Sequence, residues 1–228
     1  MRRPARKIAS WHLTAERRAI LDKALGHVPF DGWTERTLRQ GAEEAGLDDT
    51  MWRRAFPRGG ADAIEFWSEE TDREMAAALA EQDIADLKIR ERIAAAVRWR
   101  LEALAPHREA VRRSLSYLSQ PRHAGLGLRC LYRTVDEMWH AAGDTATDFN
   151  FYTKRGLLAG VYTSTLLFWL DDDSEDHAAT WPFLDRRIAD ALRIPKITAR
   201  LRKIPAAIPR PARFVRRVRE HLHEGDRG

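Results

Sequence analysis

One pairing in this sequence has the spacing of a metal site. Glu137 and His140 form a Glu-x-x-His pair within a predicted helix. An i, i+3 spacing brings both side chains to one side of a helix, and di-iron bundles use it for that reason. Such centres need two of these pairs plus two further carboxylates. The sequence offers one pair, so we interpret Glu137 as solvated and His140 as a surface or hydrogen-bonded histidine.

An acidic run could hold a divalent cation. Asp171–Asp173 is followed closely by Glu175, Asp176 and His177. Calcium loops need spaced oxygen ligands and a glycine at the turn, and this run has neither. We therefore expect a solvated helix end here.

Other catalytic signatures are missing from the sequence. It contains no glycine-rich phosphate loop, zinc-protease motif or nucleophile elbow. We predict no catalytic residue, no metal site and no cofactor, and we expect that the chain is not an enzyme. Cys130 is the only cysteine, which excludes an internal disulfide and fits a reducing cytoplasm. It lies among leucines and is predicted to be a small core residue.

The composition is that of a soluble helical globule. Hydrophobic residues make up 44% of the 228 residues and charged residues 32%. No apolar run approaches the roughly 20 residues that a membrane-spanning helix needs. The N-terminus is basic, but no apolar segment follows it, so we expect no secretory signal.

The positive charge is concentrated at the C-terminus. The net charge is +5, yet residues 195–228 alone carry ten lysines and arginines against three acids. The rest of the chain is therefore slightly acidic. This distribution indicates an anionic partner for the tail rather than for the whole body.

Apolar spacing and helix breakers predict the elements that position these residues. Helices are expected over 14–26, 34–45, 49–56, 61–82, 86–104, 107–119, 127–141, 149–171, 176–193 and 211–223. No strand-like alternation of useful length occurs. The sequence predicts an all-α protein. Its expected parts are a basic tail (1–13), a helix-turn-helix-like module (14–60), a helical lipid-binding domain (61–194), and a proline-rich linker with a basic amphipathic helix (195–228).

Residues 35–57 resemble the DNA-binding unit of TetR-family regulators. Trp52 and Phe56 stand four apart, like the aromatic pair that packs the recognition helix in those proteins. The resemblance implies a TetR-like helical bundle. However, Asp48 and Asp49 precede the helix that would face phosphate, where carboxylates are repelled. Arg53 and Arg54 compensate only partly, so we expect no nucleic-acid partner; a ligand-responsive transcriptional repressor remains the alternative function.

Two longer stretches carry a second resemblance. The first comprises residues 20–34 and 56–61, and the second runs from 147 to 165 and continues through Trp169, 171–174 and 180–188. Together they resemble the accessory family of ubiquinone (coenzyme Q) biosynthesis, over roughly residues 14–193. The resemblance implies a TetR-like homodimer that binds no DNA. It also implies a lipid pocket for isoprenoid quinone intermediates, and docking onto the di-iron hydroxylase of the pathway.

The resemblance also assigns a docking surface. In that family the surface near an Asp-Phe-Asn-aromatic-Tyr stretch contacts the hydroxylase. The matching partner-binding residues here are Asp148, Asn150, Phe151, Tyr152 and Arg155. Relatives more often have tryptophan at the position of Phe151.

An isoprenoid quinone has a long apolar chain and a polar ring, so its host needs an apolar cavity with few polar groups. Apolar and polar-edged positions on the long helices supply the candidate lipid-binding residues. They are Trp67, Met75, Leu131, Val135, Met138, Leu158, Val161, Tyr162, Thr165, Leu166 and Trp169. The alternative for each is ordinary core packing, which is the usual role of a helical apolar stripe.

The C-terminal helix is predicted to meet a membrane. Its apolar face carries Phe214, Val215, Val218 and Leu222, with Arg216 and Arg217 beside it. A basic amphipathic helix of this kind suits an anionic bilayer surface. Docking on the protein's own body, or on nucleic acid, are the alternatives. We therefore expect a cytoplasmic protein, peripheral on the inner membrane, that presents lipid to the hydroxylase.

Overall fold

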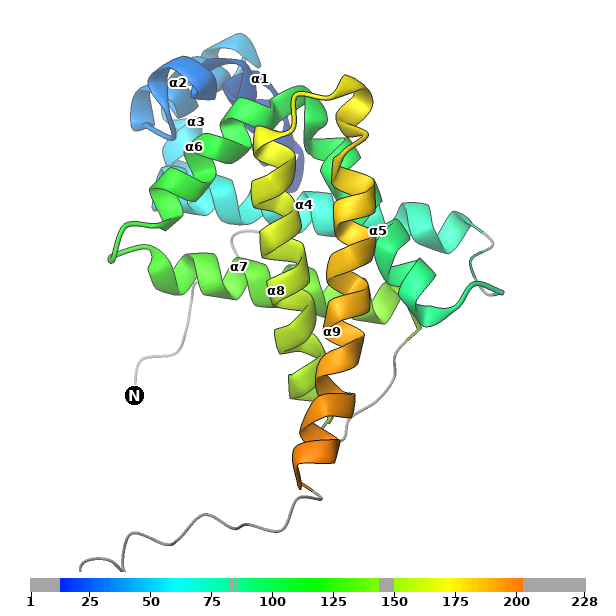
Figure 1. The fold of residues 1–228 in the computed structure, drawn as a ribbon. Coiled ribbons are helices and arrows are strands. Elements are labelled where there is room, and N and C mark those ends of the chain that lie inside the picture. Colours follow the sequence, from blue (N-terminus) through cyan, green and yellow to red (C-terminus); the bar gives the residue numbers. More distant parts are fainter. Residues whose placement is uncertain (1–12, 83, 85, 144–149, 203–228) are drawn as a thin grey trace, which may run out of the picture. The chain divides into compact units, whose positions relative to one another are not determined.

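The computed structural model describes residues 13–82, 84, 86–143 and 150–202, without the side chains of 150–152 and 194–202. Every regular element in these ranges is helical, which confirms the all-α prediction (Figure 1). The α-helices are α1 (Thr14–Asp31), α2 (Glu35–Glu44), α3 (Met51–Ala55), α4 (Gly60–Glu81), α5 (Ile89–Leu104), α6 (Arg108–Leu118), α7 (Ala124–Ala141), α8 (Asn150–Asp171) and α9 (Thr180–Arg202). Short 3-10 turns, η2 (Ala105–His107) and η3 (Glu175–His177), precede α6 and α9.

The chain divides into two units, Met1–Ile188 and Ala189–Gly228. The described part of the second unit is the C-terminal end of α9, which runs through Pro195 to Arg202. The predicted helix end at 193, and a linker starting at 195, are therefore wrong for residues 194–202. A single proline removes one backbone hydrogen bond, and the flanking lysine, alanine, leucine and arginine favour a helix. The predicted helix over 211–223 lies outside the described residues.

Helix α1 also extends beyond its predicted end at residue 26. It continues through Pro29, and Gly32 closes it with φ +70°, its N–H donating to the Val28 carbonyl at 2.9 Å. Proline disrupts the turn that precedes it, so near a C-terminus it costs only that turn. Val28 is fully buried, and its packing holds this last turn in place.

The turn signals of the N-terminal module place α2 and α3 as expected. Thr34 is the N-cap of α2, and its hydroxyl oxygen accepts from the Thr37 N–H at 3.2 Å. Before α3, the Asp48 carboxylate accepts from both the N–H and the hydroxyl of Thr50, at 2.8 and 2.5 Å. Helices α1 and α2 pack on each other and on α3, which is the predicted helix-turn-helix arrangement.

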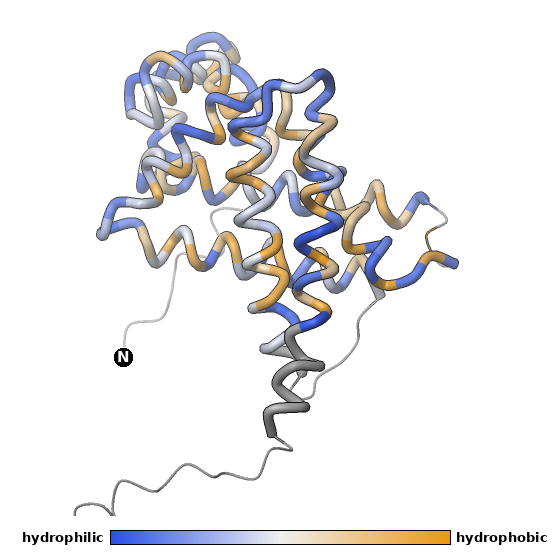
Figure 2. Tube along the Cα trace, viewed as in Figure 1, coloured by the Kyte–Doolittle hydropathy of each residue, from blue (hydrophilic) through white to orange (hydrophobic). Residues whose placement is uncertain are grey.

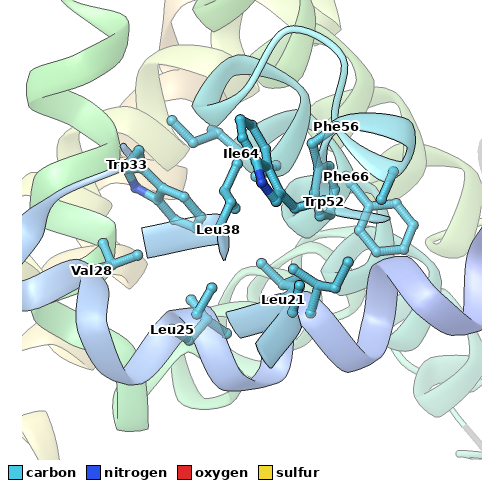
Figure 3. Close-up of a cluster of buried hydrophobic side chains, with 14 of the residues drawn as sticks. Leu21, Leu25, Val28, Trp33, Leu38, Trp52, Phe56, Ile64 and Phe66 are labelled. Carbon is cyan, nitrogen blue, oxygen red and sulfur yellow. The ribbon is translucent and has the colours of Figure 1, made fainter. Parts of the chain in front are cut away.

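The module has a solid aromatic core (Figure 3). Trp33, Trp52, Phe56 and Phe66 are each at most 5% exposed and pack with the leucines and isoleucines of α1, α2 and α4. The rings of Phe56 and Phe66 lie 6.1 Å apart in a tilted arrangement, a geometry that aromatic pairs favour. Trp52 and Phe56 thus fill the places that the spacing predicted.

Close backbone approaches in this module require glycine. A β-carbon at Gly60 would collide with the carbonyl oxygen of Trp33 and lie 2.9 Å from the Trp33 Cβ. A β-carbon at Gly41 would lie 2.6 Å from the carbonyl oxygen of Ile20. These two glycines let α4 and α2 pack directly against the neighbouring backbone.

The remaining helices of the first unit form a helical body. Helix α4 packs on α5 and α7, α5 packs on α7 and α8, and α7 packs on α8. Helix α6 contacts both α1 and α7, so it belongs to the module and to the body at once. Met75, Val97, Leu101 and Met138 are fully buried between these helices.

The acidic run at the end of α8 is only partly solvated. The side chains of Asp171 and Asp173 are 80% and 94% exposed, but Asp172 is buried. Its carboxylate accepts from the N–H and the hydroxyl of both Ser174 and Thr180, at 2.6–3.0 Å. The prediction of a solvated helix end is wrong for Asp172, because this side chain ties the end of α8 to the start of α9.

Hydropathy is mixed along the helices (Figure 2). Hydrophobic and hydrophilic positions alternate within them, as expected for helices that bury one face. Within the described ranges, no helix combines the length and the apolar character needed to cross a bilayer.

Candidate functional site

The helical body encloses a cavity of about 410 Å³. Helices α4 to α8 all contribute to its wall. The lining residues are Ile64, Trp67, Ser68, Thr71, Arg100, Leu104, Val111, Ser114, Leu115, Leu118, Ser119, Gly127, Cys130, Leu131, Thr134, Tyr162, Thr163, Leu166 and Leu167. The volume is within the range of about 300–1,000 Å³ usual for small-molecule sites.

Most of the wall is apolar. Trp67 is its largest side chain, and its ring lies 5.6 Å from that of Trp33 in the module and 6.2 Å from that of His107. Ser114 also lines the cavity, and its hydroxyl oxygen accepts from the Trp33 indole N–H at 2.8 Å. Trp67 and Ser114 therefore line the cavity on one side and contact the core of the module on the other.

A buried arginine interrupts the apolar wall. Arg100 is 5% exposed, and its Nε donates to the Tyr162 hydroxyl oxygen at 2.9 Å. Its Nη2 donates to the Ser68 hydroxyl at 3.2 Å, and its Nη1 lies 2.8 Å from an oxygen of Asp72. The Arg100–Tyr162–Ser68 cluster, as we call these three lining side chains, gives the cavity one polar region.

Asp72 supports this cluster from behind the wall. It is 2% exposed, and its second oxygen accepts from the Thr134 hydroxyl at 3.1 Å and lies 3.4 Å from Arg133 Nε. Arg133 in turn donates to Glu69 at 2.6 Å. The two arginines are therefore matched by two carboxylates, and the buried charge is balanced as it must be in a low-dielectric interior.

Titration behaviour follows from these contacts. Burial lowers the pKa of Arg100, but Tyr162 and Asp72 more than offset this, so its pKa lies above the usual arginine value. Arg100 is thus permanently charged. Burial raises the pKa of the Cys130 thiol, so this cavity-lining cysteine stays protonated and unreactive at neutral pH.

The cavity is open to solvent. Ser119 at the end of α6 and Leu167 on α8 line it and are exposed, Leu167 by 52%. Arg100, Thr71, Thr134 and Tyr162 are each at most 6% exposed and form the closed region. The cavity therefore runs from a buried polar region to a mouth at Ser119 and Leu167.

Four of the predicted lipid-binding residues line this cavity: Trp67, Leu131, Tyr162 and Leu166. The others are buried at 0–6% exposure and lie outside its lining; they are Met75, Val135, Met138, Leu158, Val161, Thr165 and Trp169. The structure places these seven in the positions expected from the packing alternative. A helical apolar stripe selects buried positions, but it does not distinguish a packed one from a lining one.

Sequence reasoning missed the contributions of α5 and α6. Arg100 is the main omission, and a signal for it exists. The buried positions of α5 are Ile93, Ala96, Val97, Arg100, Leu101 and Leu104, at helical spacing. A charged residue in the middle of an apolar stripe indicates a buried, paired charge.

The predicted docking surface is only partly described. Asp148 lies outside the described residues, and Asn150, Phe151 and Tyr152 are placed in the first turn of α8 without side chains. Arg155 is 4% exposed, and its guanidinium pairs with the Asp136 carboxylate at 2.6 Å. Arg155 thus bridges α8 and α7.

The remaining candidate sites offer little chemistry. Glu137 is half-buried and His140 exposed, and no group of three or more His, Cys, Asp or Glu side chains that could hold a metal occurs among the described residues. Asp48 and Asp49 are exposed in front of α3, and hydrogen bonds from Thr50 lower the pKa of Asp48, which favours its charged form. The predicted membrane residues, from Phe214 to Leu222, lie outside the described range.

Comparison with known proteins shows which sequences the chain resembles. Residues 124–195, which include α7 and α8, match the model of the COQ9 family. The chain is similar in sequence to the COQ9 family over this region. The rat mitochondrial ubiquinone biosynthesis protein COQ9 is 38% identical over 180 residues, and the human protein is 36% identical over the same length. The fruit-fly COQ9 is 33% identical over 186 residues.

These matches cover 76% of this chain for the rat and human proteins and 79% for the fruit-fly protein. They cover 57%, 56% and 56% of those proteins. The chain therefore spans little more than half the length of these mitochondrial COQ9 relatives.

The TetR-like fold is confirmed by a solved structure. A TetR transcriptional regulator from Nitrosomonas europaea superposes with a TM-score of 0.63 at 25% sequence identity. The superposition covers 78% of this chain and 98% of the regulator. The COQ9-related sequence is thus folded as a TetR-like helical bundle.

Proposed function

We propose that the chain is a lipid-binding accessory protein of ubiquinone biosynthesis, which holds an isoprenoid quinone intermediate in its cavity and presents it to the di-iron hydroxylase of the pathway. The hydroxylase performs the chemistry, and this chain binds and delivers. The cavity carries the proposal: it is mostly apolar, open to solvent and built in large part from α7 and α8. Those helices lie inside the region that matches the COQ9 family.

The lipids that co-purify with the chain test this directly. Mass spectrometry of the extracted ligand is expected to find a prenylated aromatic ring. Leu131→Trp should fill the cavity and abolish co-purification, because Leu131 lines it. Leu128→Trp is the matched control on the same helix, since Leu128 is 68% exposed and outside the lining. Equal retention of lipid by both variants would contradict a ligand in this cavity.

Hydroxylase docking is the second part of the proposal. The partner surface comprises Asp148, Asn150, Phe151 and Tyr152 at the start of α8, and Arg155 supports it through Asp136. Tyr152→Lys should weaken hydroxylase binding at least about tenfold, as expected for an aromatic at an interface centre. Leu128→Lys adds the same charge to α7 and should leave the affinity unchanged. An unaltered affinity in Tyr152→Lys would refute this surface.

Membrane attachment is the third part. The chain is proposed to act as a homodimer on the inner membrane face, held by the basic apolar segment that includes Phe214, Arg216, Arg217 and Leu222. Each basic residue near an anionic surface contributes about 1 kcal/mol. Deleting residues 205–228 should therefore abolish salt-sensitive sedimentation with anionic liposomes. Binding that survives the deletion would place the membrane contact elsewhere.

A TetR-type repressor is the alternative function, because a regulator with this fold superposes on the chain. The exposed Asp48 and Asp49 carboxylates in front of α3 oppose phosphate contact. A gel-shift assay with DNA from upstream of its own gene distinguishes the two functions. Sequence-specific binding at physiological salt would favour the repressor.

A further inference from the structure

The cavity wall brings together side chains that can recognise one kind of chemical group. Arg100 and Tyr162 come from α5 and α8, and Ser68 comes from α4. The hydroxyl oxygens of Tyr162 and Ser68 lie 2.9 and 3.2 Å from nitrogen atoms of the Arg100 guanidinium. All other large side chains of the wall are apolar, so this cluster is where a polar ligand group would find partners.

Arg100 has donors that the protein does not use. A guanidinium carries five N–H donors. Nε donates to Tyr162 and Nη2 to Ser68, which leaves the second N–H of Nη2. Nη1 lies 2.8 Å from its ion-pair partner, Asp72 Oδ1, and neither of these two buried atoms has a partner that meets hydrogen-bond geometry. A buried donor without a hydrogen-bond partner is unfavourable, so a ligand oxygen placed beside the Arg100 guanidinium would be favoured.

Tyr162 adds a donor of its own. Its oxygen accepts from Arg100, so the hydroxyl proton is available to donate in another direction. Within the described part of the chain, no acceptor is paired with this proton. A ligand oxygen placed beside Arg100 and Tyr162 could accept from both.

The charge balance around the cluster selects the kind of oxygen. Arg100 and Arg133 already face the Asp72 and Glu69 carboxylates. A phosphate or carboxylate headgroup would bring a third negative charge into this buried region, at a large desolvation cost. A carbonyl, ether or phenol oxygen accepts the same hydrogen bonds without that cost.

The position of the cluster sets the orientation of the ligand. Arg100 and Tyr162 lie in the closed region, whereas Leu167 is 52% exposed at the mouth. Five residues separate Tyr162 from Leu167, which is about 7.5 Å along α8. One substituted ring fits that depth, and an attached chain would lie along the apolar wall toward the mouth.

We propose that Arg100 and Tyr162 form the head-recognition site of the cavity, and that it takes an uncharged, oxygen-substituted aromatic or quinone ring, inserted head first with its apolar chain toward Leu167. Arg100 and Tyr162 donate to the ring oxygens. Ser68 and Asp72 hold the guanidinium in place. This inference rests on the proposed lipid-binding function and adds the selectivity of its site.

Three probes separate the head from the chain. Ubiquinone-2 has an uncharged, oxygen-bearing ring and two isoprene units. Geranylbenzene has the same chain on a ring without oxygens, and decanoate has an anionic head. Each is added to the full chain, and its dissociation constant is measured by displacement of Nile red. We expect ubiquinone-2 to bind about tenfold more tightly than the other two, the effect of one or two buried hydrogen bonds.

Tyr162→Phe is the decisive variant because it removes one hydroxyl and keeps the ring. It should weaken ubiquinone-2 binding about 5- to 10-fold and change geranylbenzene binding less than twofold. Tyr132→Phe is the matched control, since Tyr132 is 48% exposed on α7 and outside the lining. Arg100→Met should show the same selective loss where it folds, and circular dichroism checks that it does.

Each outcome decides between the two proposals. If ubiquinone-2 and geranylbenzene bind the unaltered chain equally, or Tyr162→Phe weakens both alike, the head site is wrong and the lipid cavity stands. Tighter binding of decanoate would overturn the preference for an uncharged head. If none of the three probes displaces Nile red, the lipid-binding function itself fails.

Discussion

The N-terminal module and the helical body use similar residues for opposite purposes. In the module, Trp33, Trp52, Phe56 and Phe66 fill the space between α1, α2, α3 and α4 (Figure 3). In the body, Trp67, leucines and the buried Arg100, which is paired with Asp72 behind the wall, surround a cavity of about 410 Å³. An apolar stripe at helical spacing is thus compatible with a solid core and with a hollow one, and the difference depends on how many large rings meet at the centre.

The largest effect should come from emptying the solid region. Phe56→Ala is expected to cost about 4 kcal/mol of unfolding free energy, because Phe56 is fully buried among other rings. Leu166→Ala removes a buried side chain from the cavity wall and should cost about 2 kcal/mol, at the low end for such a change, since one side of Leu166 already lacks packing partners. Urea unfolding measures both. Costs in the reverse order would contradict the contrast between solid and hollow regions.

Breaking the buried ion pair should have the next largest effect. Asp72→Asn leaves Arg100 charged and buried without its counter-ion, which should cost about 3 kcal/mol. Glu69→Gln is the control, because the Glu69 side chain is 38% exposed and its pairing with Arg133 is worth at most about 1 kcal/mol. Thermal unfolding at neutral pH compares them. Similar losses of stability in both variants would mean that the buried Arg100–Asp72 pair contributes no more than the exposed pair.

Enlarging a buried side chain should also distinguish the two regions, because the module has no free space and the body has a cavity. Leu38→Phe enlarges a fully buried side chain of the module and should cost about 1–3 kcal/mol through overpacking. Leu131→Phe enlarges a cavity-lining residue, where space exists, and should cost less than about 0.5 kcal/mol. The measurement is the denaturation midpoint of each variant. A comparable loss at Leu131 would show that the cavity is not available to a larger side chain.

The smallest effect is expected at the end of α8, where hydrogen bonds rather than apolar packing hold the helix in place. Hydrogen bonds from Ser174 and Thr180 outweigh burial and lower the pKa of Asp172 from 3.8 to about 2. A carboxylate with a lowered folded-state pKa contributes stability above its unfolded pKa, and this contribution is lost as the pH falls from about 4 to about 2. Asp172→Asn should cost about 1 kcal/mol at pH 7.

The pH profile provides the check on that prediction. Unfolding free energies of the parent chain and of Asp172→Asn should differ at pH 5–7 and converge near pH 2. Asp171→Asn is the matched control, since the Asp171 side chain is 80% exposed. A difference that persists unchanged to pH 2 would exclude Asp172 ionisation as the cause.

Much of the fold followed from local sequence signals. The helix predicted over 34–45 is present as α2, and Trp52 and Phe56 pack in the module where their spacing placed them. Two helix ends were missed at prolines: Pro29 and Pro195 both stand inside helices that were expected to stop before them. A proline penalises a helix locally, whereas packing of residues such as Val28 decides whether the helix continues.

The site was less predictable than the fold. Trp67, Leu131, Tyr162 and Leu166 were identified, but burial alone could not separate them from packed residues such as Met138 and Trp169. Whether a buried side chain borders a cavity depends on how several helices cross. The apolar periodicity of a single helix contains no information about those crossings. Arg100 was readable in principle, as a charge inside the apolar stripe of α5.

The hydrogen bond from Trp33 to Ser114 links the two regions. Ser114 lines the cavity, and Trp67, which also lines it, lies against the Trp33 ring at 5.6 Å. Moving Trp33 out of the module would therefore remove the contacts that support Ser114 and Trp67 in the cavity wall. Opening the short connection between α1 and α2, which contains Trp33, would loosen the cavity as well. Amide hydrogen exchange of residues 32–38 consequently reports on the state of the void, although none of those residues borders it.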